Sequence, residues 1–125
     1  MSAPNGVAVT VRHLGDFTLA EGTHGLRATA FSIRIVDDTA QELTLPQSAV
    51  AIFTTDHRTL FPSAGISFKG AACFAYSHGN LTLMPRTDFT YPAPLCFVLE
   101  SPNRPAAVPT DLLVDVGSTV DFRLR

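Results

Sequence analysis

The stretch LRATAFSIRIV, residues 26–36, decides the fold class of this 125-residue chain. Its large apolar residues Phe31, Ile33 and Ile35 alternate with smaller or polar ones, and a period of two places the two sets on opposite faces of a strand. β-branched and aromatic side chains suit a half-buried strand better than a helix. Two aspartates then end the run with side chains typical of turns. We therefore predict the central strand of an antiparallel sheet, with Phe31, Ile33 and Ile35 in the core.

Seven or eight short strands separated by turn residues are predicted along the chain. A first strand over residues 7–11 is interrupted at 13–16, and residues 95–99 form an apolar run that we expect to be a second central strand. Leu112, Val114 and Val116 are expected to face inward. Nine prolines and eight glycines punctuate the chain, and no segment has helical periodicity. This spacing favours an immunoglobulin-like antiparallel β-sandwich, with a small β-barrel as the alternative, built as a single domain over residues 1–125.

Charge and hydropathy exclude several classes of partner. The formal net charge is −2, and no basic stripe suggests a nucleic-acid or anionic membrane surface. No apolar run approaches the roughly 18 residues that a membrane span needs. Residues 1–11 lack the basic and apolar regions of a signal peptide. We therefore expect an extracytoplasmic location if a signal peptide has been removed, and a cytoplasmic one otherwise.

The two cysteines, Cys73 and Cys96, lie in apolar segments 71–76 and 95–99 that we predict to be strands. They can form a disulfide if the strands are neighbours in one sheet, because the Cα atoms must come within about 7 Å. If the strands belong to different sheets, the sulfur atoms stay apart. We predict two free thiols, with the disulfide as the alternative. The spacing is not that of a metal site.

Candidate acid–base and metal-binding residues are dispersed. Four histidines lie in predicted turns or at strand ends: His13, His24, His57 and His78. None has metal-ligand spacing, and no nucleophile motif such as G-x-S-x-G occurs. We expect no catalytic residue, no metal and no cofactor. The alternative is a histidine cluster with Asp16 or Asp56, assembled by loops at one end of the sandwich.

Phenylalanine is the dominant aromatic residue, with nine copies and no tryptophan. Four of the nine lie near predicted turns and are candidates for apolar contacts: Phe17, Phe61, Phe68 and Phe89. If they converge, they form an apolar mouth that could accept a lipid or a partner protein. The alternative is that they fill the open ends of the sandwich.

Three segments carry a resemblance to a known family: LRATAFSIRIVDD (26–38), LTLPQSAVAIFTTDHRTLFP (43–62) and GNLTLMPRTDFTYPAPLCFVLESP (79–102). Their pattern resembles a family of small bacterial extracytoplasmic domains that includes the secreted mycobacterial immunoprotective antigen. The resemblance spans residues 7–116 and implies an immunoglobulin-like sandwich outside the cytoplasm. The family has no established catalytic residues. Arg86-Thr87 stands where the family usually has a glycine after the proline.

Three functions are compatible with these patterns. We favour a non-catalytic interaction or structural module whose partner is another protein or a second copy of the chain. The first alternative is a carrier of a small apolar molecule, with the strands closed around a pocket. The second is a cofactor-free barrel enzyme that uses an Asp or His acid–base group in such a pocket.

Overall fold

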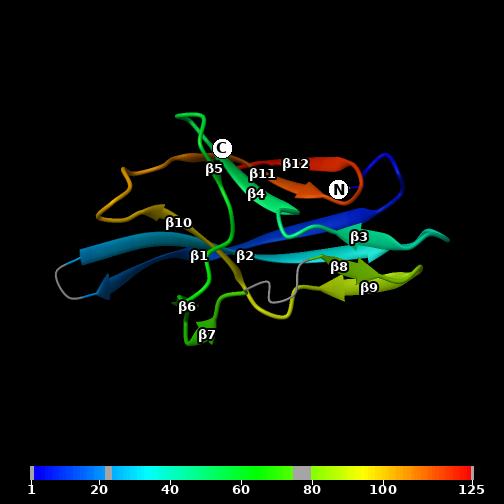
Figure 1. Ribbon diagram of the computed structural model, residues 1–125, viewed down its shortest axis with the longest axis horizontal. Helices are drawn as coiled ribbons and strands as arrows, with labels where there is room; N and C mark the ends of the chain where they lie inside the picture. The colour runs from blue at the N-terminus through cyan, green and yellow to red at the C-terminus, as the bar shows by residue number, and fades with distance from the viewer. Residues whose placement is uncertain (1, 22–23, 75–79, 125) are drawn as a thin grey trace.

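The computed structural model describes residues 2–21, 24–74 and 80–124 and contains two four-stranded antiparallel sheets (Figure 1). The first sheet consists of β1 (Ala8–Glu21), β2 (His24–Asp37), β9 (Thr87–Thr90) and β10 (Leu95–Glu100). The second consists of β4 (Val50–Thr54), β5 (Thr59–Leu60), β11 (Pro109–Asp115) and β12 (Thr119–Arg123). Two small pairs complete the fold: β3 (Leu43–Leu45) with β8 (Leu81–Leu83), and β6 (Ser67–Phe68) with β7 (Ala71–Ala72). Neither main sheet closes into a barrel within the described residues, which confirms the predicted antiparallel β-sandwich.

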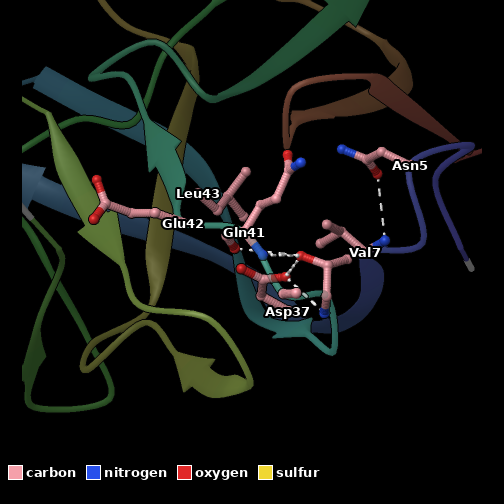
Figure 2. Close-up of a pocket in the computed structure, with 8 residues that line it drawn as sticks. Asn5, Val7, Asp37, Gln41, Glu42 and Leu43 are labelled. Carbon is pink, nitrogen blue, oxygen red and sulfur yellow. Dashed lines mark hydrogen bonds between the residues drawn. The ribbon is translucent and has the colours of Figure 1, made fainter.

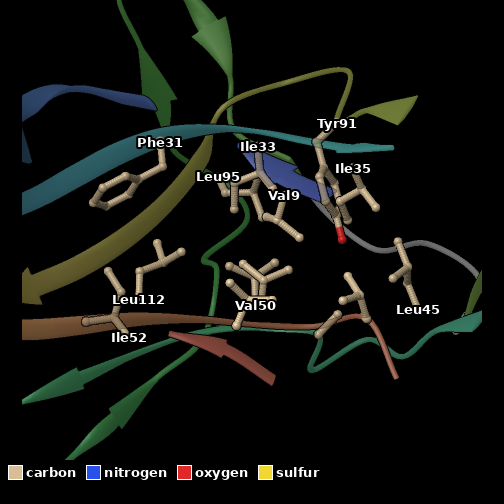
Figure 3. Packing of buried hydrophobic residues seen from close by; sticks show 14 of the residues in the cluster. Val9, Phe31, Ile33, Ile35, Leu45, Val50, Ile52, Tyr91, Leu95 and Leu112 are labelled. Atoms are coloured by element: carbon tan, nitrogen blue, oxygen red, sulfur yellow. The ribbon is translucent and has the colours of Figure 1, made fainter. Parts of the chain in front are cut away.

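The core lies between the two sheets (Figure 3). Figure 3 shows Phe31, Ile33 and Ile35 of β2 on the side of the core that faces Val50, Ile52 and Leu112 of the second sheet. The fully or nearly fully buried apolar side chains come from both sheets: Val9, Phe31, Ile33, Ile35, Val50, Ile52, Leu95, Phe97, Leu99, Leu112, Val114, Val116 and Val120. The inward faces predicted for β2 and for residues 112–116 are therefore confirmed.

Strand β2 is the central strand of the first sheet, as predicted. It pairs with β1 along its whole length, while β10 and β9 share its other side. The prediction that residues 95–99 form a second central strand is wrong, because β10 pairs only with β2 in the described part of the chain. Its five apolar residues are nevertheless all buried. The burial of the outward-facing Cys96 comes from the β6–β7 hairpin, which covers this side of β10.

A β-bulge replaces the predicted interruption of the first strand. β1 is continuous, but His13 pairs with Phe31 while Gly15 pairs with Ala30, so that Leu14 is the extra residue. The bulge reverses the alternation of the strand. Gly15 has a φ of 147°, which favours glycine, and a Cβ there would meet the Phe68 ring at 3.5 Å. The turn residues therefore mark a real irregularity that bends the strand without ending it.

Cys73 and Cys96 form a disulfide with a Cα–Cα distance of 5.8 Å, so the prediction of two free thiols is wrong. That prediction placed Cys73 in a long strand over residues 71–76. In the structure β7 contains only Ala71–Ala72, and residues 75–76 lie outside the described residues. The β6–β7 hairpin packs on the outer face of the first sheet, where it buries Phe68 against Ala30. The disulfide therefore joins a covering hairpin to a sheet strand.

The β6–β7 hairpin has a two-residue turn, Lys69-Gly70, with positive φ at both positions (49° and 84°). Two such residues define the type I′ turn, in which Asn-Gly is preferred because asparagine tolerates the left-handed region. We expect Lys69→Asn to raise the free energy of unfolding by about 0.5–1 kcal/mol, measured by urea denaturation. Lys69→Ala is the matched control, because it also removes the ammonium group near the Phe68 ring but lacks the side-chain amide that lets asparagine adopt the left-handed region. Equal stability of the two variants would contradict the turn assignment.

Candidate functional site

The outer face of the second sheet carries an exposed aromatic residue, Phe53. Because β4 alternates, Ile52 enters the core while Phe53 points away from it and is 45% exposed. Phe53 pairs with Asp111 on one side and with Thr59 on the other. Asp111 in turn pairs with Arg123. A cross-strand row of one aromatic and several polar side chains therefore lies on a four-stranded platform. We call this surface the Phe53 face, formed by Ala51, Phe53, Thr59, Asp111, Leu113, Asp121 and Arg123.

A hollow of about 420 Å³ adjoins Phe53 at the β4–β5 hairpin. Its wall consists mainly of hydroxyl-bearing side chains, together with two basic ones: Thr54, Thr55, Thr59, Thr110, His57 and Arg58.

The hairpin that forms this hollow is held in place by its polar side chains. The Thr54 hydroxyl donates to Asp56 and holds the pKa of that carboxyl below its usual value. Arg58 donates to Asp56 at 2.7 Å and to the carbonyl oxygens of Pro105 and Ala106 at 3.1 and 3.2 Å. The hairpin is therefore fixed to the segment that precedes β11, and the hollow is preformed.

Two carboxyl groups give the Phe53 face its negative charge. Asp111 and Asp121 lie on neighbouring strands, and Arg123 Nε is 3.7 Å from Asp111 Oδ2. Hydrogen bonding to Asp111, together with desolvation, raises the pKa of Asp121, while hydrogen bonding to Asp121 lowers the pKa of Asp111. A proton shared by the pair therefore resides on Asp121, and when both groups are ionised they repel each other beside a single cation, Arg123.

We expect Asp121→Asn to raise the melting temperature at pH 7. The raised pKa of Asp121 means that the folded state binds its proton more tightly than the unfolded state. This contribution to stability is complete below the unfolded pKa and is lost as the pH rises through the folded pKa. The variant carries no charge at position 121, so the difference in melting temperature between the variant and the wild type should shrink toward zero as the pH falls to about 4. Thermal unfolding between pH 4 and 8 measures this, and a difference that does not depend on pH would contradict the interaction.

The four phenylalanines proposed as apolar-contact residues do not converge. Phe17 and Phe68 contact each other on the outer face of the first sheet, with ring centroids 5.2 Å apart. Phe89 packs on the main core, 5.0 Å from the Tyr91 ring. Phe61 is 51% exposed near the second sheet. Three of them therefore cover or fill the sandwich, and only Phe61 remains largely open to a partner.

Phe53 was missed by the sequence analysis because it lies inside an apolar run, residues 49–53, that suggests burial on both faces. The run does place Ala49, Val50, Ala51 and Ile52 in buried positions. The sequence did offer one indication, because neighbouring residues of a strand point to opposite faces and Ile52 is the core residue next to Phe53. It assigns Phe53 to the outward face, where the other apolar residues of its strand and of the neighbouring β11 are the small Ala51 and the partly buried Leu113.

His13 lies within β1, which corrects its assignment to a turn. Its Nε2 atom is 3.1 Å from Asp16 Oδ1 and 2.9 Å from Thr29 Oγ1, because the bulge brings His13 and Asp16 to the same side of the strand. This contact joins a single histidine to Asp16 within one strand and is not the loop-assembled histidine cluster expected as an alternative. Both oxygen atoms contact the same ring nitrogen, so the ring cannot relay a proton from Thr29 to Asp16 as in a catalytic triad.

The other three histidines lie elsewhere in the chain. His57 lies in the β4–β5 turn with a φ of 64°, and His24 is the first residue of β2. His78 lies outside the described residues. No group of three or more His, Cys, Asp or Glu side chains among residues 2–21, 24–74 and 80–124 could hold a metal ion.

Comparison with known proteins adds no relative. No protein-family model, no curated protein and no solved structure matches this chain. Within the described residues, no helix is long and apolar enough to cross a membrane.

Proposed function

We propose that this protein is a non-catalytic binding module that acts in an oxidising, extracytoplasmic compartment and recognises a partner protein through the Phe53 face. The observation that carries the proposal is Phe53 itself, 45% exposed on a sheet platform beside a preformed hollow. Aromatic residues next to pockets are the usual energetic centres of protein interfaces. A β-sandwich presents such a side chain without a loop that must be ordered on binding.

The filled interior supports surface binding over the two alternatives. A carrier of apolar molecules and a barrel enzyme both need enclosed space, whereas the described strands form two open sheets packed on a common core. The immunoglobulin-like resemblance agrees with a module that binds through its surface. The disulfide supports the compartment, because stable disulfides belong to secreted and extracellular proteins.

The partner's chemistry follows from the Phe53 face. An apolar side chain of the partner would enter the hollow beside Phe53, and basic groups would lie against Asp111 and Asp121. Because these carboxyl groups are at the surface, the charge pairing should act mainly on the association rate and weaken with salt.

Photo-crosslinking tests the proposal. p-Benzoylphenylalanine placed at position 53 should link one partner in the native extracellular or periplasmic milieu. The same probe at Arg34, on the outer face of the first sheet, should not link it. A yield that is the same from both positions would reject the Phe53 face as the interface.

With the purified partner, Phe53→Ser should weaken binding at least tenfold, because it removes the central aromatic contact. Titration calorimetry at low and high salt measures this. Phe61→Ser is the matched control, since it removes an equally exposed phenylalanine (51%) outside the lining of the hollow, and it should cost less than threefold. If Phe53→Ser leaves the affinity unchanged, the aromatic residue is not the anchor.

A further inference from the structure

A second concave site lies where β2 ends and the chain leads into β3 (Figure 2). Its volume is about 350 Å³. The walls combine two carboxylates, two amides and apolar side chains, without any basic residue: Asn5, Val7, Asp37, Gln41, Glu42 and Leu43. In Figure 1 this region lies at the β3 end of the sandwich, away from the β4–β5 hairpin that borders the Phe53 face.

Asp37 is the feature of this pocket that local structure does not explain. Its residue surface is 0% exposed. Oδ1 accepts from the backbone nitrogen of Thr39 at 3.1 Å and from its hydroxyl at 2.5 Å. Oδ2 has no hydrogen-bond partner. Among the described residues it is the only buried side-chain oxygen or nitrogen atom that lacks one. The turn accounts for one oxygen only, as Figure 2 shows. A buried carboxylate oxygen without a donor is costly, and such groups call for a specific explanation.

Two neighbouring donors, Asn5 and Arg86, have partners elsewhere. The Asn5 side-chain amide donates to the Val116 carbonyl oxygen at 2.8 Å. Arg86, the nearby guanidinium, pairs with Asp38 at 3.5 Å. The pocket therefore offers an acceptor and negative charge, from Asp37 within and Glu42 at the exposed rim, to a ligand that brings its own donor.

We propose that this pocket binds a primary alkylammonium group, which donates a hydrogen bond to Asp37 Oδ2. The buried Val7 and Leu43 side chains would contact the methylene stem, and Glu42 would add attraction at the rim. A hard divalent cation fits less well, because calcium takes six to eight oxygen ligands and the described residues hold no suitable acidic cluster. The ammonium group belongs either to a lysine side chain or to a free amine.

The test follows the carboxyl carbon of Asp37 by ¹³C NMR during titration with n-butylammonium, with Nα-acetyl-lysine N-methylamide and with the neutral 1-butanol. We expect a saturable shift with the ammonium compounds and none with 1-butanol. Tighter binding of the lysine derivative would identify a protein lysine as the source, and binding of n-butylammonium alone would identify a free amine. No shift at tens of millimolar ammonium, an equal shift with 1-butanol, or a saturable shift with calcium chloride would each overturn the proposal.

Variants give a second measurement by calorimetry. Asp37→Asn keeps an oxygen acceptor for Thr39 but loses the charge, and it should bind n-butylammonium at least tenfold more weakly. Glu42→Gln is the matched control at the exposed rim and should lose less than threefold. Equal losses of affinity in the two variants would assign the binding to diffuse surface charge and overturn the proposal. If Asp37→Asn does not fold, the wild-type titration against 1-butanol still decides.

Discussion

Replacing Phe97 with alanine should lower the free energy of unfolding by about 3–5 kcal/mol. Phe97 is fully buried in β10, where it pairs with Thr29 of β2. Its ring meets Phe31 edge-on, with the centroids 6.1 Å apart. Truncation removes the contacts that this ring makes with both sheets, and a close-packed core cannot collapse to fill the space. The loss would be a large share of the 5–15 kcal/mol that stabilises a typical domain.

Urea denaturation of Phe97→Ala measures this loss. Phe61→Ala is the matched control, because the same atoms are removed from a side chain that is 51% exposed, and it should change stability by less than about 0.5 kcal/mol. Similar losses in the two variants would mean that β10 does not present Phe97 to the core.

The architecture was predictable in strands where large apolar side chains alternate with small or polar ones. The alternation of Phe31, Ile33 and Ile35 assigned the core side of β2 correctly, and Leu112 and Val114 did the same for β11. In these strands the burial pattern depends on the two-residue period alone. The alternation also fixes the pairing register of each strand, because a shift by one residue would expose every large apolar side chain.

Prediction failed where burial comes from an element distant in sequence. The apolar run of β10 indicated a strand flanked on both sides, yet its outward-facing Cys96 is covered by a hairpin that residues 67–72 form. The bulge at Leu14 likewise depends on the partner strand, since two residues must oppose one. Neither the covering hairpin nor the pairing can be read from local periodicity.

The candidate site was only partly accessible from sequence for the same reason. Phe53 was hidden in an apolar run, and the hollow beside it depends on Arg58, which binds carbonyl oxygens of Pro105 and Ala106 far along the chain. The unpaired oxygen of Asp37 was also invisible, because an aspartate after a strand is an ordinary turn residue. Only the three-dimensional arrangement shows that the turn uses one of its two oxygen atoms.

The disulfide should contribute about 3 kcal/mol to stability, the entropy expected for closing a loop of this length. Cys73 and Cys96 are 23 residues apart. The double variant Cys73→Ala/Cys96→Ala should show this loss in urea denaturation. It should also show faster hydrogen exchange in residues 66–73, because the β6–β7 hairpin has only a small apolar cluster to hold it on the first sheet. Removing both cysteines avoids a lone thiol that could pair between molecules.

Thiol titration of the denatured, unreduced wild-type protein checks the bond directly. We expect no reactive thiol before reduction and two afterwards. Two reactive groups before reduction would contradict the disulfide and remove the support for an oxidising compartment. That result would leave the Phe53 face intact, because its strands β4, β5, β11 and β12 pair without either cysteine. The proposed compartment and the proposed binding surface are therefore tested independently. The crosslinking experiment at position 53 tests the binding surface.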